Sequence, residues 1–383
     1  MAKLLVPGDL APWFHAAALG GSPRYAFDTV AGRAIVLLFH GSAGWPASQA
    51  ALQVVERHRH LFDDANACFF GVSIDPGDVS EKRIEPSLPG IRWFLDHDRA
   101  VSGRYGAVDD EGEAQRYRPH WLLLDTMLRV VDRAEIADGD RIMAGLEALI
   151  GQNRDRSRDI NAPVLIAPRI LEPALCRQLI ELYERQGGEE SGFMREENGM
   201  TVLKVDHAHK RRSDCAIEDE QLIAALRARL NRFLRPMISR AFQFDATRIE
   251  RWIVACYDDD HGGGHFRAHR DNTTKGTAHR KFACTINLNA EDYEGGDLRF
   301  PEFGARTYRA PTGGAVVFSC SLLHEATPVT RGKRYAFLPF LYDDAGAAVR
   351  QQNLQFLAPE FGSYNAGLPG NAPGPAELAK PDG

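Results

Sequence analysis

Cysteine is scarce in this sequence and never occurs as a C-x-x-C pair. The 383 residues include six cysteines: Cys68, Cys176, Cys215, Cys256, Cys284 and Cys320. Their scattered positions argue against a zinc ribbon, a dithiol redox motif and a disulfide framework. We interpret most of them as small buried hydrophobic residues.

The sequence also lacks a large charge excess and a long apolar run. Its formal net charge is −6 at pH 7, which gives no electrostatic reason to expect nucleic acid or an anionic membrane as a partner. The first residues, MAKLLVPGDLAPWF, hold only a short apolar run before Pro7. We therefore expect neither a signal peptide nor a membrane helix, and predict a cytoplasmic protein with soluble partners.

The chain is long enough for two domains, and its first part predicts an α/β domain over residues 1–152. Continuous apolar runs at 34–39, 69–74 and 121–124 are typical of strands buried on both faces. Residues 46–62 have helical spacing and begin with a proline suited to the first turn. Helices are therefore expected to cover the sheet.

A polar, charged stretch predicts a linker over residues 153–162, followed by a second domain over 163–346. This part begins with two amphipathic helices, at 173–185 and 222–233, the second with interleaved arginines that we interpret as a solvated face. Strand candidates with alternating or apolar patterns follow, at 282–289, 297–300, 315–318 and 334–341. They predict an antiparallel sandwich or barrel. Residues 347–383 form a C-terminal extension whose Pro/Gly-rich tail we expect to be disordered.

The segment HGGGHFRAHRD places His261, His265 and His269 four residues apart and ends at Asp271. Three consecutive glycines disfavour a helix through them, so we interpret His261 and His265 as loop residues without a ligand role. His269 and Asp271 differ, because residues two apart on an extended segment project to the same side. They can bind one cation together.

A third ligand candidate is His324, which an antiparallel partner strand would bring opposite His269. Two imidazoles and one carboxylate on one side of an octahedral ion leave open positions, as in non-heme Fe(II) oxygenases. A bidentate 2-oxo acid would take two of these positions and dioxygen the last. Arg334, ten residues after His324, could hold the far carboxylate of a dicarboxylate co-substrate. The alternative for Arg334 is an ordinary cation at a strand end.

Several elements occur in the order and spacing of a known family: Tyr257, Phe266, His269-x-Asp271, LNAEDYEGGDLRF (288–300) and HEATPVTRGKRY (324–335). Over about residues 160–345 the chain resembles the prolyl 4-hydroxylase-like branch of the Fe(II)/2-oxoglutarate dioxygenases. The resemblance implies a double-stranded β-helix, or jelly roll, in an α+β domain. It also implies roles for individual residues. His269, Asp271 and His324 would bind the iron, Arg334 would bind the distal carboxylate of the co-substrate, and Tyr257 would line the co-substrate pocket.

Three features depart from that family or stay outside the predicted site. The loop 258–265 is enlarged and glycine-rich, which makes it a candidate lid. Asn287 stands where some relatives place a tyrosine that binds the co-substrate. We assign no catalytic role to the basic residues of HKRRSD at 209–214.

The first domain resembles the peroxiredoxin/thioredoxin-like fold over roughly residues 3–150. The resemblance rests on GDLAPWF (8–14), FHG (39–41), GVSID (71–75) and RYGAV (104–108). In peroxiredoxins a cysteine thiolate occupies the first turn of the helix after the second of these segments, flanked by an arginine that Arg118 matches. The corresponding position here is Ser48.

A serine hydroxyl stays protonated near neutral pH and cannot replace a thiolate nucleophile. Cys68, in an apolar strand, is a poor substitute for it. We therefore predict a degenerate redoxin domain without peroxidase activity, used for docking, for substrate presentation or to form a homo-oligomer.

Together these features predict an Fe(II)- and 2-oxoglutarate-dependent dioxygenase that hydroxylates a C–H bond and releases succinate and CO2. The resemblance implies a prolyl residue of a peptide or protein as the substrate, with a small molecule as the alternative, and ascorbate as a reductant. Two other hypotheses stay open. One is a thiol-dependent antioxidant with a metal-binding accessory domain, against which Ser48 speaks. The other is a non-enzymatic, metal-stabilised interaction or sensor protein, against which Arg334 speaks.

Overall fold

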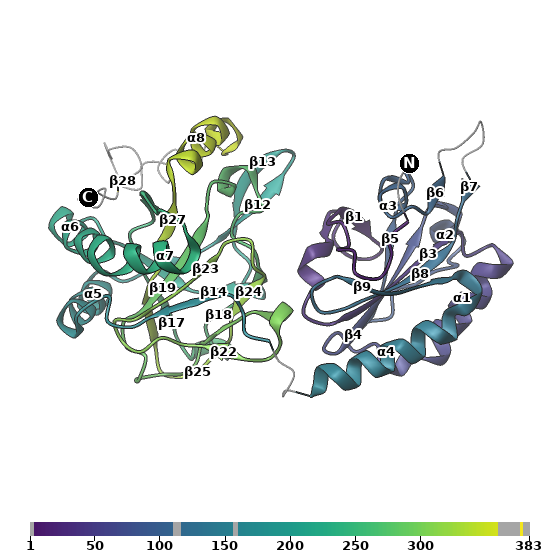
Figure 1. Ribbon diagram of the computed structural model, residues 1–383, viewed down its shortest axis with the longest axis horizontal. Helices are drawn as coiled ribbons and strands as arrows, with labels where there is room; N and C mark the ends of the chain where they lie inside the picture. The colour runs from purple at the N-terminus through teal and green to yellow at the C-terminus, as the bar shows by residue number, and fades with distance from the viewer. Residues whose placement is uncertain (1–3, 110–115, 156–159, 359–375, 378–383) are drawn as a thin grey trace. The chain divides into compact units, whose positions relative to one another are not determined.

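The computed structural model describes residues 4–109, 116–155, 160–358 and 376–377. It divides the chain into two compact units, Met1–Ile160 with Pro301–Ala305, and Asn161–Phe300 with Arg306–Gly383 (Figure 1). The predicted linker at 153–162 starts inside a helix that continues to Arg154. Residues 156–159 of that linker lie outside the described residues.

The first unit is built on one mixed sheet with the strand order β2-β1-β5-β4-β3-β8-β9. Strands β3, β4 and β5 run parallel, whereas β8 runs antiparallel to β3 and β9 antiparallel to β8. The strands of this sheet are β1 (His15–Ala18), β2 (Tyr25–Ala26), β3 (Ala34–Gly41), β4 (Ala67–Ser73), β5 (Ile91–Leu95), β8 (His120–Leu124) and β9 (Val130–Glu135). The unit also has a separate strand pair, β6 (Val108–Asp109) and β7 (Arg116–Tyr117). Its α-helices are α1 (Pro46–Arg57), α2 (Gly77–Ser80), α3 (Ala100–Arg104) and α4 (Gly139–Arg154).

The central strands of this sheet are buried on both faces, as their continuous apolar runs predict. Helices α1 and α4 pack on one face, where they share a core with alternate residues of β3, β4 and β8 (Figure 1). Aromatic rings fill the other face, where Phe70 and Phe94 stack at 4.9 Å. The unit has the thioredoxin-like α/β fold that the sequence predicts.

The second unit contains two facing antiparallel sheets. The larger follows the order β11-β15-β17-β26-β19-β27-β16-β28, with β23 on the other side of β19 and β10 beyond it; the smaller is β14-β18-β24-β21-β22. The strands of these sheets are β10 (Leu165–Ala167), β11 (Glu189–Glu190), β14 (Lys210–Arg211), β15 (Ser213–Ala216), β16 (Arg248–Glu250), β17 (Ile253–Tyr257), β18 (His265–His269), β19 (Phe282–Asn287), β21 (Leu298–Arg299), β22 (Thr307–Tyr308), β23 (Ala315–Ser319), β24 (His324–Ala326), β26 (Arg334–Phe337), β27 (Phe340–Tyr342) and β28 (Ala376–Glu377). This arrangement is the predicted jelly roll.

The second unit has two further, short antiparallel strand pairs: β12 (Phe193–Glu197) with β13 (Met200–Lys204), and β20 (Glu294–Gly295) with β25 (Val329–Arg331). Its α-helices are α5 (Pro173–Gln186), α6 (Glu220–Arg229), α7 (Arg235–Phe242) and α8 (Asp344–Asn353). A π-helical turn, Leu230–Leu234, joins α6 to α7. Helix α8 crosses the domain boundary that we predict at residue 346.

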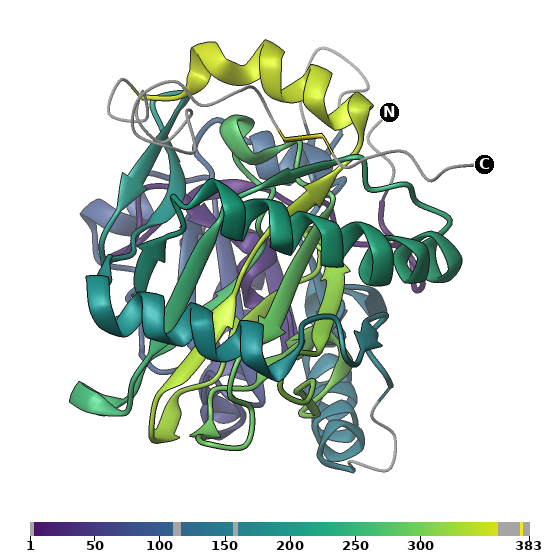
Figure 2. The same cartoon turned by 90° about the vertical axis from the view of Figure 1, so that its left-hand side faces the viewer.

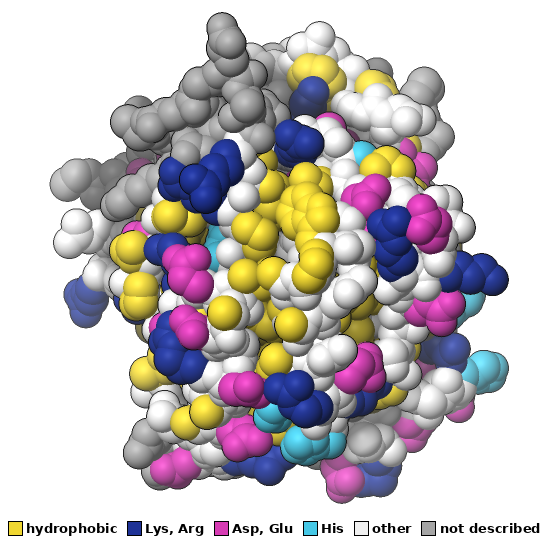
Figure 3. Space-filling model, turned by 90° about the vertical axis from the view of Figure 1, so that its right-hand side faces the viewer, with side chains coloured by type: hydrophobic (Ala, Val, Ile, Leu, Met, Phe, Trp, Pro, Cys, Tyr) yellow, Lys and Arg dark blue, Asp and Glu magenta, His cyan; other side chains and the backbone are white. Residues whose placement is uncertain are grey.

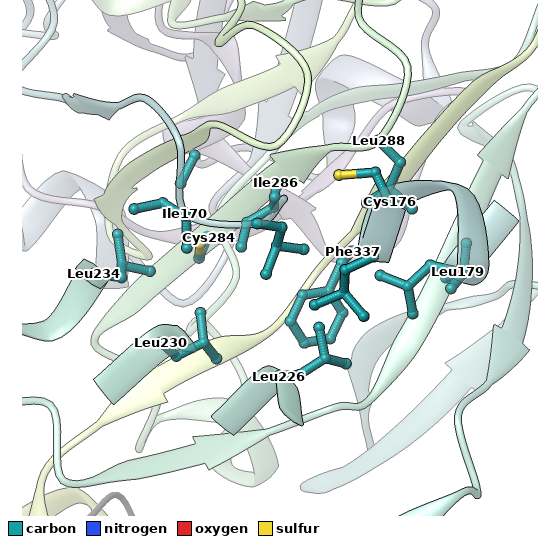
Figure 4. Close-up of a cluster of buried hydrophobic side chains, with 14 of the residues drawn as sticks. Ile170, Cys176, Leu179, Leu226, Leu230, Leu234, Cys284, Ile286, Leu288 and Phe337 are labelled. Atoms are coloured by element: carbon teal, nitrogen blue, oxygen red, sulfur yellow. The ribbon is translucent and has the colours of Figure 1, made fainter. Parts of the chain in front are cut away.

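Helices α5, α6 and α7 cover the outer face of the larger sheet (Figure 2). Figure 4 shows their leucines, among them Leu179, Leu226 and Leu230, packed against Cys284, Ile286 and Phe337 of the sheet (Figure 4). The alternation in β19 therefore has the predicted outcome: one set of side chains faces this core, and the other set faces the space between the two sheets.

Two expectations about this unit need correction. The segment 334–341 is not one strand but two, β26 and β27, separated at Leu338 and Pro339, because proline has no N–H to donate to the ladder. Arg235, which we counted among the interleaved arginines of the second helix, begins α7, is buried and pairs its guanidinium with Asp245 at 2.6 Å, so these arginines are not all solvated. Of the tail predicted to be disordered, only β28 is described; residues 359–375 and 378–383 lie outside the described residues.

The surface carries some apolar side chains, and on the face drawn in Figure 3 they gather near the centre among charged groups. Among the described helices, none is long and apolar enough to cross a membrane.

Candidate metal centre and pocket

The pairing of β18 with β24 creates the centre of the site. His269 and His324 are direct register partners in these strands, and Asp271 follows two residues after the end of β18. The Asp271 carboxylate lies 3.5 Å from His269 Nε2 through one oxygen and 3.3 Å from His324 Nε2 through the other. One donor atom from each residue can be chosen so that all lie within 4.8 Å of one another. The structure thus brings the three predicted ligands together.

Hydrogen bonds orient both imidazole rings toward this point. His269 Nδ1 lies 2.7 Å from the Arg267 carbonyl oxygen, and His324 Nδ1 lies 3.0 Å from that of Leu322. A carbonyl only accepts, so Nδ1 carries the proton and Nε2 keeps its lone pair for a cation. The Phe266 ring stacks on His269 at 3.5 Å and limits its rotation.

Electrostatics favour the metal-binding protonation states. Burial, helped by the neighbouring His324 ring, lowers the pKa of His269 to about 4, so this ring is neutral near neutral pH. Burial acts to raise the pKa of Asp271, but His324 and then His269 hold it below its ordinary value. Metal ligation needs a neutral imidazole and an ionised carboxylate, which is the pair of states favoured here.

A pocket opens at this centre, and the three candidate ligands are among the residues that line it. Arg334 and Tyr257 both line it and face each other as register partners in β26 and β17. The Arg334 guanidinium carbon lies 4.9 Å from the Tyr257 ring centroid. Arg334 is 2% exposed, and its Nε and Nη1 have no hydrogen-bond partner in the described part of the chain. A buried guanidinium with free donors is suited to a carboxylate ligand.

The sequence reasoning missed two further arginines of this pocket, Arg212 and Arg251. We assigned no catalytic role to the segment 209–214, yet Arg212 Nη1 lies 3.4 Å from the Tyr257 hydroxyl. Arg212 and Asp214 are two residues apart, which on an extended segment puts them on the same side. That spacing, the same as for His269 and Asp271, was the available signal.

The other histidines of the HGGGH segment stay outside the metal centre. His261 lies in the 3₁₀ turn η6 (Asp260–Gly262), and His265, which we expected in a loop, is the first residue of β18, with Nδ1 2.9 Å from the Gly263 carbonyl oxygen. A Cβ on Gly263 would lie 2.3 Å from the Val329 carbonyl oxygen, and one on Gly264 would lie 2.7 Å from Tyr257 Cα. Gly263 therefore lets this loop approach β25, and Gly264 lets it approach the strand that carries Tyr257.

Asn287, at the position of some relatives' co-substrate tyrosine, has a different environment. It is 2% exposed, and its Nδ2 donates to the Ala310 carbonyl oxygen at 2.7 Å. Ala283 and Thr285, which precede Asn287 on this face of β19, line the pocket, whereas Asn287 does not.

The first unit has no cysteine at the redoxin position. Ser48 is fully buried in the first turn of α1 and donates its hydroxyl to the His40 carbonyl oxygen at 2.7 Å. Cys68 donates its thiol to Asp64 at 3.0 Å, and burial raises its pKa to about 12. A thiol with so high a pKa has almost no thiolate at neutral pH.

Comparisons with known proteins agree with both halves of this description. The sequence model of the 2OG-Fe(II) oxygenase superfamily matches residues 252–342, and that of the AhpC/TSA family matches residues 7–131. A PKHD-type hydroxylase of Synechococcus sp. (strain JA-2-3B'a(2-13)) is 33% identical over 94 residues, which cover 23% of this chain and 41% of that protein. The chain thus matches less than half the length of this curated relative.

Two solved structures are similar to different parts of the chain. One is a prolyl hydroxylase from Trichoplax adhaerens in complex with a hypoxia inducible factor oxygen degradation domain peptide fragment, with 19% identity, 49% of this chain and 86% of that chain covered, and a TM-score of 0.37. The other is the peroxidoxin BcpB from Mycobacterium tuberculosis, with 18% identity, 38% and 98% covered, and a TM-score of 0.33.

The donor set fits the cation that the oxygenase superfamily implies. Two imidazole nitrogens and one carboxylate oxygen converge from β18, β24 and the turn after β18, and the pocket with Arg334 lies beside them. This is the ligand type expected for Fe(II) in non-heme oxygenases, and the family also implies 2-oxoglutarate. The resemblance seen in the sequence is confirmed at the level of these matches: residues 7–131 are similar to the AhpC/TSA family, and residues 252–342 are similar to the 2OG-Fe(II) oxygenase superfamily.

Proposed function

We propose that the protein is an Fe(II)- and 2-oxoglutarate-dependent dioxygenase that hydroxylates a C–H bond. In this reaction dioxygen gives one oxygen atom to the substrate and one to 2-oxoglutarate, which becomes succinate and CO2. The observation that carries the proposal is the convergence of His269, Asp271 and His324 beside the free donors of Arg334. The match to the oxygenase superfamily and the hydroxylase name of the relative support it.

Each residue has a role that follows from its position. His269, Asp271 and His324 would hold the iron, which when bound supplies the oxidation of an unactivated C–H bond. Arg334 would bind the distal carboxylate of 2-oxoglutarate through its unpaired N–H groups, and Tyr257 would line the same pocket and support that guanidinium through its ring face. Fixed donors of this kind orient the co-substrate before the reaction begins.

For the substrate we propose a prolyl residue in a peptide or protein, with a small molecule such as free proline as the alternative. This finer statement rests on the sequence resemblance to the prolyl 4-hydroxylase-like branch. We also propose ascorbate as the reductant that returns oxidised iron to Fe(II).

The test is succinate formation by the full chain supplied with Fe(II), 2-oxoglutarate and ascorbate, with prolyl peptides and free proline as candidate substrates. His269→Ala should abolish it, Arg334→Ala should reduce it strongly at limiting 2-oxoglutarate, and His261→Ala, a change outside the metal centre, should retain it. Failure of the wild-type protein to bind Fe(II), together with no succinate above the enzyme-free level, would overturn the proposal. Omitting ascorbate should reduce the number of turnovers, and the same turnover number without it would remove ascorbate from the scheme.

The antioxidant alternative finds no support in the first unit. Its reactive position is a buried serine, and Cys68 is held as a thiol by burial and by Asp64. We propose that this unit serves docking, substrate presentation or self-association, without peroxide chemistry.

A further inference from the structure

A second group of charged residues lies near Tyr257; two of its members, Arg212 and Arg251, line the pocket, and the proposed reaction gives the group no role. Asp214 is its centre: one carboxylate oxygen lies 2.7 Å from Arg212 Nη2 and 3.1 Å from Arg251 Nη2. The Lys210 side chain is close by: its Nζ donates a hydrogen bond of 2.7 Å to Ser191 Oγ, which in turn lies 2.5 Å from the same Asp214 oxygen. One carboxylate therefore serves two guanidinium groups.

This group has an excess of positive charge in a buried place. Arg212 and Lys210 are less than one tenth exposed, and the Arg251 side chain is 16% exposed. Buried charges are unfavourable unless an opposite charge compensates them. Asp214 compensates one of the two arginines, so the group remains short of at least one negative charge.

Unused hydrogen-bond donors accompany the excess charge. The Nε of Arg212 and the Nε of Arg251 are both buried and have no hydrogen-bond partner in the described part of the chain. A buried donor without a partner costs about 1–3 kcal/mol, and more when it is charged. Each guanidinium thus keeps one free N–H, and a carboxylate has two oxygens to accept from such a pair.

The co-substrate does not account for these donors. Arg334 has unpaired N–H groups of its own, at Nε and Nη1, and can donate to a co-substrate carboxylate without Arg212 or Arg251. Tyr257 contacts both positions: its ring faces the Arg334 guanidinium, and its hydroxyl lies 3.4 Å from Arg212 Nη1. Arg212 and Arg251, which line the same pocket as Arg334, therefore keep unpaired donors in addition to those of Arg334.

We propose that Arg212 and Arg251 form a second anion-binding position, which binds a carboxylate of the substrate. The inference rests on the proposed function, and it deepens it by naming the substrate class: a molecule with a carboxylate near the carbon to be hydroxylated. That carboxylate belongs either to a small free acid or to an acidic peptide. Arg212 and Arg251 are then specificity-determining residues.

The test uses acetate as the probe and acetamide as its neutral match. The full chain is loaded with Mn(II) and saturated with 2-oxoglutarate, and the proton relaxation of each probe's methyl group is measured. A paramagnetic ion relaxes protons steeply with proximity, so a probe bound in this pocket is affected and a probe elsewhere on the surface is not. We expect several-fold stronger relaxation of acetate than of acetamide.

Arg251→Gln is the informative variant, because it leaves Asp214 paired with Arg212 and removes the more exposed arginine. It should abolish the preference for acetate. Arg331→Gln is the matched control, since Arg331 is exposed and pairs with Glu294 on the surface; it should keep the preference. Equal relaxation of both probes, or an unchanged acetate effect in Arg251→Gln, would overturn the inference, because the carboxylate would then bind without this arginine.

A failure of the proposed function can be distinguished from a failure of this inference by measuring metal binding. Mn(II) binding is read separately from the relaxation of bulk water, and its absence in the wild-type protein would remove the metal centre itself. Mn(II) and 2-oxoglutarate binding without an acetate effect would remove only the second anion position.

Turnover then identifies the source of the carboxylate. Succinate formation is compared between L-proline and L-prolinamide, and between acetyl-Pro-Asp and acetyl-Pro-Asn peptides with amidated C-termini. If L-proline supports succinate formation better than L-prolinamide, the carboxylate belongs to a small free acid. If acetyl-Pro-Asp supports it better than acetyl-Pro-Asn, the carboxylate belongs to an acidic peptide. If the amide of the pair that supports turnover has the same half-saturating concentration as its acid, the result counts against the proposal. The acid's advantage should be at least about tenfold in the half-saturating concentration, which corresponds to about 1.4 kcal/mol, and should vanish in Arg251→Gln.

Discussion

The rings of His269 and His324 lie 4.3 Å apart between their centroids, because the two residues are register partners in neighbouring strands of the smaller sheet. Asp271 lies within 3.5 Å of both Nε2 atoms. A cation at this point would satisfy three donor atoms at once. The site therefore depends on the β18–β24 pairing as much as on the residue types.

Replacing His324 with alanine should remove metal-dependent stabilisation. In the wild-type protein, Fe(II) or Mn(II) at one hundred times its Kd should stabilise the second unit by about 2.7 kcal/mol, because the metal binds only the folded state. The melting temperature with and without metal measures this effect, and His324→Ala should show none. His261→Ala is the control and should keep the full increase. An increase that persists in His324→Ala would place the metal elsewhere.

Replacing Arg334 with methionine should weaken 2-oxoglutarate and leave the metal in place. Hydrogen bonds to charged groups contribute about 1.5–3 kcal/mol each, so we expect the KM for 2-oxoglutarate to rise at least about tenfold. Arg331→Met, on the exposed surface, should leave it unchanged. A KM within twofold of the wild-type value would show that Arg334 does not hold the co-substrate.

The first unit should be inert toward peroxide. Cys68, whose pKa burial raises to about 12, has too little thiolate to act as the nucleophile. Peroxide consumption by the purified chain should therefore equal that of buffer, and Cys68→Ser should change nothing. Consumption that disappears in Cys68→Ser would restore the antioxidant hypothesis.

His40 should make the first unit less stable in acid. The ring is fully buried, both ring nitrogens lack a hydrogen-bond partner in the described part of the chain, and burial lowers its pKa to about 4 from an ordinary 6.5. Between these two values the unfolded chain binds a proton that the folded chain does not. The free energy of unfolding therefore falls as the pH drops from 6.5 to 4 and levels off below that.

A difference of one in pKa is worth about 1.4 kcal/mol, so the whole effect is roughly 3 kcal/mol. Urea unfolding of the wild type and of His40→Leu across this pH range measures it, since other titrating groups contribute equally to both. His60→Gln, which replaces an exposed histidine, should keep the wild-type slope. Parallel pH profiles for the wild type and His40→Leu would contradict the prediction.

Much of the fold could be predicted from local sequence patterns. The apolar runs of β3, β4 and β8 indicated strands buried on both faces, and the alternation in β19 indicated one face toward the helices. These predictions are confirmed because periodicity reflects burial directly. The break between β26 and β27 was missed, although Pro339 marks it.

By itself the sequence determined the residue types available to the site: an H-x-D pair, a later histidine, an arginine ten residues beyond it, and a serine where a redoxin needs cysteine. Only the tertiary structure decided that Arg212 and Arg251 share the pocket with Arg334 and that one carboxylate, Asp214, serves both. The physical reason is that β14 and β15 lie in different sheets, so the chain between them crosses the edge of the barrel. Spacing along a strand predicts which side chains share a face, but which strands meet across a barrel depends on long-range pairing that no local pattern records.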